Sequence, residues 1–362
     1  MSLSTPTLTR NAPFRFVKQS LGNPFLSLRS IPFLIVLAGS LAILPAVRAD
    51  AVSTIPVDAP GSLGGIVASP NRTEVYVADG ASQRIGVIDT ISNQIKSFIA
   101  TANAPIGLGV SADGNTLYVT EGLTVSPFTG FLEAISLTSF SQLFIVTVGT
   151  SPGLPGVSSD GSTVYVPSTS SPGTVAPVGG PLTGSTITVG GRPSEVVFNQ
   201  NNTKAYVSTQ TKKIVIIHTA TGAVTKIATP SPTDGLAILG TTLFATSRNS
   251  KVFVIDTNSN TVIDTIKVPT PTTGNFVLGF PALTPDGAFL YVPVTEQIST
   301  PPVFGNTVVV ISTKTNEVEG QPIKVGQVPF QVAVAADDIY GYSSNFTDGT
   351  VTVFGLLHLP PL

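Results

Sequence analysis

Eight charged or amide side chains are the best candidates for chemistry in this chain of 362 residues, of which only 10% are charged. They are Asp79, Glu121, Arg192, Glu195, Asp234, Arg248, Glu296 and Asn345. Carboxylate and carbonyl oxygens are the ligands that Ca²⁺ prefers, and a carboxylate can act as the general base that hydrolyses a lactone. These side chains can act together only if the fold gathers them at one place.

Other kinds of chemistry lack the residues that they need. The chain contains no cysteine and only two histidines, His218 and His358. Haem and copper sites need histidine or thiolate ligands, and a catalytic triad needs a histidine beside its nucleophile. We therefore expect no disulfide, no catalytic residue of these kinds and no cofactor, with Ca²⁺ as the one metal left open.

The first 49 residues have the pattern of a signal peptide. A basic segment without acids precedes an apolar run of 17 residues at 31–47, and Val47 and Ala49 occupy the positions that a signal peptidase reads. The basic residues of that segment are Arg10, Arg15, Lys18 and Arg29. We expect cleavage after Ala49 and export to the periplasm, the cell surface or the medium. The alternative is a retained signal anchor, for which the apolar run is short.

The charge of the mature chain argues against nucleic acid as a partner. Five of the 18 basic residues lie in the first 49 residues and none of the 20 acidic ones does, which leaves 13 basic residues and a net charge of −7. A phosphate backbone is bound by clustered cations, and no such cluster occurs here. We expect a protein or glycan partner and no membrane span in the mature chain.

A short phrase that ends in an aromatic residue recurs along residues 50–362, as in DGNTLYVT at 113–120 and GAFLYVP at 287–293. The aromatic residues are Tyr76, Tyr118, Tyr165, Tyr206, Phe244, Tyr291 and Tyr340, spaced 38 to 49 residues apart. This period, with several short strands in each unit, predicts the blades of a β-propeller. We expect an all-β domain of seven four-stranded antiparallel blades.

Each phrase forms the hairpin between the first and second strands of a blade. Asp-Gly pairs between alternating apolar runs supply the tight turn. The first strands are rich in small residues, because large side chains would collide where these strands converge on the central channel. The small residues are Gly64, Gly65, Gly107, Gly109, Gly156, Ala237 and Ala333. The aromatic residue of the second strand fills the wider gap between blades and belongs to the core.

The two ends of the repeat array predict how the ring closes. The last unit has three strands, at 331–336, 339–344 and 349–355, whereas residues 53–57 read as a fourth strand at the front of the mature chain. A ring without exposed edges needs its first and last blades joined. We expect residues 53–57 to complete the seventh blade.

These motifs resemble the YVTN-type β-propeller repeat. The matches include GQVPFQVAV at 326–334, DGNTLYVTE at 113–121 and KVFVIDTNSNTVIDTIKV at 251–268, and they cover nearly all of residues 53–355. The resemblance implies an exported or cell-surface propeller, and the repeat is also similar to that of bacterial lactonase-type and cytochrome-d1-type propellers. Residues 174–182 depart most from it, so the third strand of the third blade is the weakest expectation.

The recurring acids of the repeat have a structural explanation. Asp89 and Asp256 end the third strand of their blades, where Ser136, His218 and Ser312 stand in others. A short polar side chain at this position caps the turn into the fourth strand. We therefore assign these residues to turns and not to a catalytic site.

The propeller places the eight candidate side chains on one face. The loops that join the fourth strand of one blade to the first of the next, and the second strand to the third, surround one mouth of the channel. The eight residues fall on these loops and could form a polar pocket, a Ca²⁺ site or a lactone-hydrolysing centre. The alternative is a wet channel mouth that simply tolerates charge.

Long loops on the same face suggest an interaction surface. The second-to-third connection is long at 121–133, 168–180 and 294–306, and the first and last of these carry Phe128, Phe131, Val303 and Phe304. Apolar side chains on long surface loops are typical of binding sites. The alternative is a flap that packs over the channel.

The leading hypothesis is a non-catalytic exported propeller that serves as a protein- or glycan-binding scaffold. One alternative is a lactonase-like hydrolase that uses Ca²⁺ or the carboxylates of Glu121, Glu195 and Glu296. Another is a structural component of a surface layer.

Overall fold

The computed structural model describes residues 51–58, 60–123 and 128–358. These ranges form 29 strands, and no helix among them is long and apolar enough to cross a membrane. The predicted signal peptide at 1–49 lies outside the described residues.

The strands fall into four sets, from the channel outward. The innermost strands of blades 1 to 7 are β2 (Leu63–Ala68), β6 (Ala104–Val110), β10 (Gly156–Val157), β14 (Pro193–Phe198), β18 (Thr233–Leu239), β22 (Phe276–Leu278) with β23 (Ala282–Leu283), and β27 (Pro329–Val334). The second strands are β3 (Glu74–Asp79), β7 (Thr116–Gly122), β11 (Thr163–Ser168), β15 (Lys204–Thr209), β19 (Thr242–Ser247), β24 (Phe289–Gln297) and β28 (Tyr340–Asn345). The third strands are β4 (Arg84–Asp89), β8 (Thr129–Ser136), β12 (Thr174–Gly179), β16 (Lys213–His218), β20 (Lys251–Asp256), β25 (Val303–Ser312) and β29 (Thr350–Gly355). The outermost strands are β5 (Gln94–Ala100), β9 (Ser141–Thr150), β13 (Ile187–Thr188), β17 (Val224–Ala228), β21 (Thr261–Lys267), β26 (Glu317–Lys324) and β1 (Ala51–Pro56).

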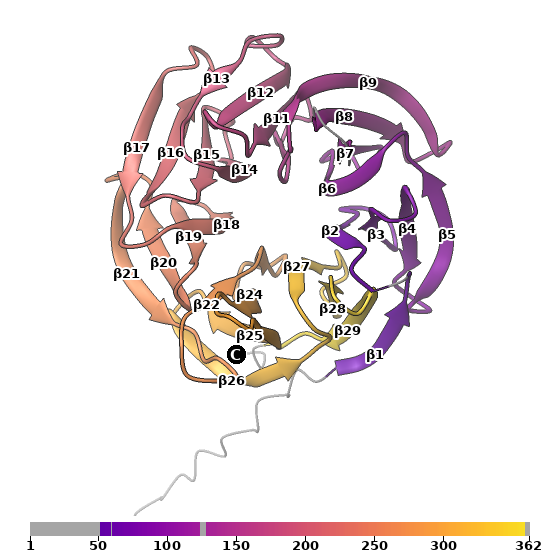
Figure 1. Cartoon of the computed structure of the whole chain (residues 1–362), viewed down its shortest axis with the longest axis vertical. Helices are drawn as coiled ribbons and strands as arrows, with labels where there is room; N and C mark the ends of the chain where they lie inside the picture. Colours follow the sequence, from indigo (N-terminus) through magenta and orange to yellow (C-terminus); the bar gives the residue numbers. More distant parts are fainter. Residues whose placement is uncertain (1–50, 59, 124–127, 359–362) are drawn as a thin grey trace, which may run out of the picture. The chain divides into compact units, whose positions relative to one another are not determined.

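Seven antiparallel sheets are arranged in a ring (Figure 1). The innermost strands of successive blades contact one another around the channel, and β27 of the last blade contacts β2 of the first. The predicted all-β, seven-bladed propeller is therefore confirmed. Blade 6 has a fifth strand because its innermost strand is divided into β22 and β23 by Gly279, Phe280 and Pro281, and a proline has no N–H for the ladder.

The N-terminal strand closes the ring as predicted. Strand β1 pairs antiparallel with β29, with Ile55 opposite Val351 and Thr54 opposite Thr352. The strand begins two residues before the expected range and ends at Pro56. Ile55 is only 2% exposed and packs in a cluster that joins blade 7 to blade 1.

Small residues on the innermost strands permit the close approach of neighbouring blades. A Cβ atom added to Gly64 would lie 2.4 Å from the carbonyl oxygen of Ile106, in blade 2. A Cβ atom added to Gly156 would lie 2.5 Å from the carbonyl oxygen of Val196, in blade 4. Neither distance is possible for a real side chain, so the predicted crowding explains these glycines.

The recurring aromatic residues lie between the blades, and the prediction of Tyr340 for the last blade is wrong. In blade 1, Tyr76 lies opposite Val67 of the innermost strand. In blade 7, the residue at the equivalent position, opposite Ala333, is Tyr342 and not Tyr340. Tyr342 is fully buried, whereas Tyr340 is half-buried. The phrase IYGY offers two tyrosines two residues apart, on the same face of the strand, and the pairing register selects the second.

Hydroxyl groups of the second strands form hydrogen bonds to the neighbouring blades. Thr120 donates to the carbonyl oxygen of Gly153 at 2.9 Å, and Thr246 donates to that of Gly279 at 2.9 Å. Each also accepts a backbone N–H of its own blade, which leaves both groups satisfied in a buried position. The seams between blades are therefore polar at the channel and apolar further out.

The turns after the third strands are capped as expected. The Asp89 carboxylate accepts the backbone N–H groups of Ile91 at 3.0 Å and Ser92 at 2.7 Å. These hydrogen bonds lower the pKa of Asp89. Asp256 caps its turn through Asn258 at 3.0 Å, so the acids of this motif stabilise turns.

One expectation about irregular segments is confirmed and another needs revision. The third strand of blade 3, the weakest expectation, is present as β12 and pairs with β11 over six residues. The segment 294–306 is mostly strand and not loop, because β24 runs to Gln297 and β25 begins at Val303. In 121–133, strand β7 reaches Gly122 and β8 begins at Thr129, and residues 124–127 lie outside the described ranges.

Candidate functional site

β-Bulges at the mouth end of the innermost strands turn side chains toward the channel opening. The ladder shifts register between Pro105 and Gly107 in blade 2, and between Pro329 and Gln331 in blade 7. A bulge adds an unpaired residue whose side chain is re-aimed, and such features are common at the rims of barrels. Here the extra residues are Ile106 and Phe330, and both line cavities at the mouth.

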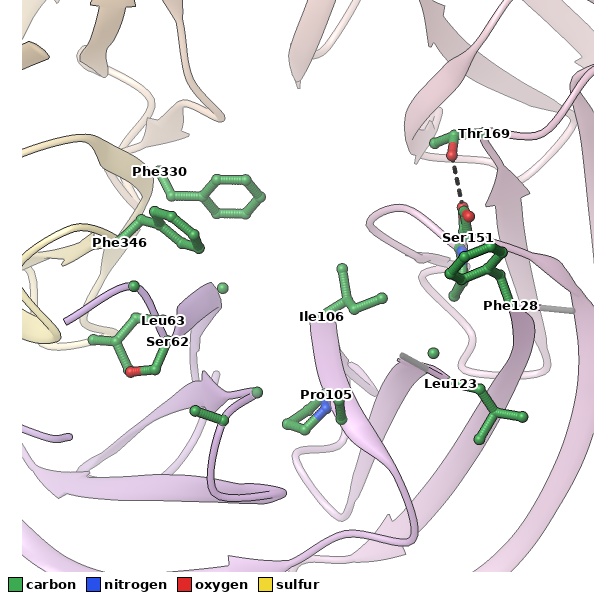
Figure 2. Close-up of a pocket in the computed structure, with 17 residues that line it drawn as sticks. Ser62, Leu63, Pro105, Ile106, Leu123, Phe128, Ser151, Thr169, Phe330 and Phe346 are labelled. Atoms are coloured by element: carbon green, nitrogen blue, oxygen red, sulfur yellow. Dashed lines mark hydrogen bonds between the residues drawn. The ribbon is translucent and has the colours of Figure 1, made fainter. Parts of the chain in front are cut away.

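The first cavity, the apolar cavity, has a volume of about 510 Å³ and lies over blades 7, 1, 2 and 3. Figure 2 shows Phe330 and Phe346 on one side of it, Phe128 and Leu123 on the other, and Ile106 between them. Phe128 is 51% exposed and Phe346 is 44% exposed. Exposed aromatic rings around a hollow are the kind of surface that a ligand or a partner covers.

The second cavity, the polar cavity, has a volume of about 450 Å³ and lies over blades 4 to 7. Its polar lining includes Gln210, Asp234, Arg248 and Glu296, from three different blades. Its aromatic lining consists of Phe280, Phe304, Phe330 and Phe346. Phe330 and Phe346 line both cavities, so the two hollows adjoin at this pair of rings.

Asp234 organises the polar cavity. It lies in the bulge between Thr233 and Leu236, and its Oδ1 accepts Gln210 Nε2 at 3.1 Å and Arg248 Nη1 at 3.3 Å. Burial raises the pKa of the Asp234 carboxyl, and the positive charges of Arg248 and Arg192 oppose that rise. Its Oδ2 is buried and has no hydrogen-bond partner among the described residues.

The structure brings three of the eight predicted side chains, Asp234, Arg248 and Glu296, into one cavity. Glu296 is half-buried near the end of β24. Arg192 is exposed just before β14, close enough to Asp234 for its charge to act on that carboxyl. These four residues are the charged part of the site.

The other four predicted residues make contacts within the protein. Asp79 is fully buried and forms an ion pair with Arg84 at 2.7 Å, and Arg84 also lies 3.6 Å from Asp58 beside the closing strand. Burial raises the pKa of Asp79, and the hydrogen bond from Arg84 opposes it. Asn345 is also fully buried and donates to Thr352 at 2.9 Å.

Glu121 is one of two buried carboxyls in blade 2. Its Oε2 accepts the backbone N–H of Asn103 at 3.1 Å and the side-chain amide of the same residue at 3.0 Å. Burial, together with the neighbouring Glu133 carboxyl, raises the pKa of Glu121 to about 8. Glu121 is therefore mostly protonated at neutral pH and buried away from both cavities. Glu133 was not among the predicted site residues.

Glu195 lies in the seam between blades 4 and 5. Its Oε2 accepts the backbone N–H of Leu236 at 2.5 Å, and the residue is only 8% exposed. Burial raises its pKa to about 8. This position joins two blades and does not reach either cavity.

The four predicted interaction residues divide into two pairs. Phe128 lines the apolar cavity, and Phe304, 43% exposed, lines the polar one. Phe131 is half-buried in β8 opposite Glu121, and Val303 packs against the core cluster of blades 5 and 6. Phe128 and Phe304 therefore belong to the mouth surface.

Sequence reasoning missed the rings at the centre of the mouth, Phe280, Phe330 and Phe346. A signal for one of them was present in the repeat. In APIG at 104–107 and VPFQ at 328–331, the residue after the proline is the bulge residue that faces the mouth. The other two rings have no counterpart that recurs in the repeats.

The positions of the described His, Asp and Glu side chains give no support to the metal-site and hydrolase hypotheses. Within the described ranges, no three His, Asp or Glu side chains lie close enough to hold a metal ion. Glu121 accepts the backbone N–H of Asn103 and Glu195 accepts that of Leu236 in the next blade, and only Glu296 of the three carboxylates lines a cavity. The geometry does not gather the three carboxylates at one centre.

Comparison with known proteins bears on the fold. No protein-family model matches the chain, and no curated protein matches it in sequence. A chain of Kuenenia stuttgartiensis hydrazine synthase has a similar structure, with a TM-score of 0.67 and 16% identity over 83% of this chain and 97% of that one. This likeness shows the fold alone.

Proposed function

We propose that this protein is a non-catalytic β-propeller that binds a protein or glycan partner at the channel mouth. One observation carries the proposal: exposed phenylalanine rings from blades 2, 6 and 7 surround two adjoining cavities on a single face. Binding surfaces are enriched in aromatic residues, and small-molecule sites are concave and largely apolar with a few polar groups.

The setting of this surface is part of the proposal. The signal-peptide pattern of residues 1–49 and the likeness of the repeats to YVTN-type propellers support export to the periplasm, the cell surface or the medium. A ring of strands suits such a scaffold, because bulges of the inner strands fix Ile106, Phe330 and Asp234 at the mouth, and residues already fixed lose little freedom on binding.

The test compares two double variants with matched substitutions. In the first, Phe128→Ser and Phe346→Ser remove exposed rings from the mouth. In the second, Phe140→Ser and Phe144→Ser remove rings that are 40% and 38% exposed on the outside of blade 2. Phe128 and Phe140 both have positive φ, at 55° and 52°, so the backbone is matched at one position.

The immobilised proteins are exposed to an envelope extract of the native organism, and retained proteins and glycans are quantified by mass spectrometry. We expect the mouth variant to lose the component that the unaltered protein retains and the outer variant to keep it. Equal retention by both variants would contradict binding at the mouth.

A further inference from the structure

The polar cavity offers hydrogen-bond donors and acceptors side by side. The guanidinium of Arg248 has five N–H donors, and one nitrogen is directed to Asp234. Gln210 supplies an amide oxygen, and Glu296 supplies a half-buried carboxylate. A ligand that fits this set must both donate and accept, as a hydroxyl group does.

The charges of the cavity are already balanced. The carboxyls of Asp234 and Glu296 are matched by the guanidinium of Arg248 within the cavity and by that of Arg192 beside it. A cationic or anionic ligand would leave a net charge in a partly buried place, which is unfavourable. The balance favours a neutral ligand.

One wall of the cavity is aromatic. The rings of Phe280 and Phe330 lie 4.9 Å apart at 56°, and Phe304 and Phe346 are 43% and 44% exposed beside them. Aromatic faces bind flat apolar surfaces. The C–H face of a sugar ring is such a surface, with hydroxyl groups around its edge.

The polar groups are preorganised. Asp234 holds both Gln210 and Arg248 through Oδ1, from a bulge on a rigid inner strand. Its Oδ2 is buried and lacks a hydrogen-bond partner in the described part of the chain, so Oδ1 alone holds these two groups. Fixed donors and acceptors reduce the entropy lost on binding.

We propose that the polar cavity binds a neutral sugar ring of a glycan, with its hydroxyl groups on Glu296, Arg248 and Gln210 and its apolar face on the phenylalanines. The cavity volume of about 450 Å³ falls in the range of small-molecule sites. This inference rests on the proposed binding function and narrows the partner to a glycan.

The test measures binding of simple sugars to the whole protein by isothermal titration calorimetry. The probes are the methyl glycosides of glucose, galactose and mannose and free N-acetylglucosamine, with glucosamine as the cationic control and glucuronate as the anionic one. We expect at least one neutral sugar to bind and to bind more tightly than either charged control. No binding by any neutral sugar at millimolar concentration, or tighter binding of a charged control, would overturn the proposal.

A pair of variants locates the binding. Glu296→Gln keeps the shape of the side chain and removes a charge-assisted acceptor, so the affinity should fall about ten-fold or more. Glu319→Gln makes the same change at a half-buried glutamate on β26, the outermost strand of the same blade, and should leave the affinity unchanged. Equal affinities of the two variants would place the sugar elsewhere and overturn the assignment.

The outcomes separate this inference from the proposed function. If no neutral sugar binds but the Phe128 and Phe346 double variant still loses a component of the extract, the proposed function stands and the sugar assignment falls. If that variant also retains the extract component, the proposed function falls with it.

Discussion

Replacing Glu195 by glutamine should change how the stability of the propeller depends on pH. Burial in the seam between blades 4 and 5 raises the pKa of Glu195 to about 8, from an ordinary value of 4.5. This difference corresponds to on the order of 5 kcal/mol between the protonated and ionised forms. Glu195→Gln keeps an oxygen that can accept the Leu236 N–H, and it cannot ionise.

The sign follows from proton binding. Between pH 4.5 and 8 the folded state holds a proton on Glu195 that the unfolded state releases, so the free energy of unfolding falls as the pH rises through this window. The loss is complete above about pH 8. The glutamine variant should match the unaltered protein near pH 5 and exceed it by several kcal/mol, on the order of 5 at most, near pH 9.

Urea unfolding followed by circular dichroism at pH 5, 7 and 9 measures the effect, since the chain has no tryptophan. Glu121, whose pKa is also raised to about 8, titrates in both proteins and cancels in the difference. Glu317→Gln, at an exposed position of β26, is the matched control and should shift nothing. Parallel pH profiles for the unaltered protein and the Glu195 variant would refute the burial of an ionisable group in this seam.

Two further predictions concern the ring itself. Ile55→Ala should destabilise the protein by about 2–4 kcal/mol, because the side chain is buried in the closing seam. Val52→Ala, at a 58% exposed position of the same strand, should be neutral. Thermal unfolding of the two variants checks closure of the ring by β1. Gly156→Ala should lower the free energy of unfolding by about 1–3 kcal/mol, because the added Cβ would meet the Val196 carbonyl oxygen at 2.5 Å. Gly355→Ala has open space around it and should be tolerated. Equal melting temperatures of the two variants would contradict the crowding of the inner strands.

The fold could be predicted because several blades repeat the same local signals. Asp-Gly turns, small residues on the innermost strand and a buried aromatic residue on the second strand all depend on sequence close by. The closing strand could be predicted because the last repeat has three strands and the front of the mature chain has one extra strand. The choice of Tyr340 over Tyr342 failed because both residues fit the local pattern, and only pairing with Ala333 distinguishes them.

The site was harder to predict because it depends on contacts between blades. Loop position predicts Asp234, Arg248 and Glu296 on one face, and the structure has these three around one cavity. The same reasoning could not show that Glu195 reaches Leu236 of the next blade, or that Glu121 binds Asn103. Such contacts depend on how neighbouring sheets are offset, which a repeat pattern does not encode.

The central rings were missed for a related reason. Phe330 reaches the mouth through a bulge, and Phe280 lies where a proline interrupts the inner strand of blade 6. A bulge reverses the facing that strict alternation predicts for a strand. The aromatic surface therefore becomes visible only once the pairing register is known.

Binding at the mouth is tested most directly by a photo-reactive phenylalanine analogue at position 346, between the two cavities, in the protein produced in its native organism. Crosslinked products from this position are compared with those from the same analogue at position 144, on the outside of blade 2. Binding at the mouth predicts a discrete adduct, of protein or glycan, at 346 and none at 144. The same adducts at both positions, or none at 346, would contradict it.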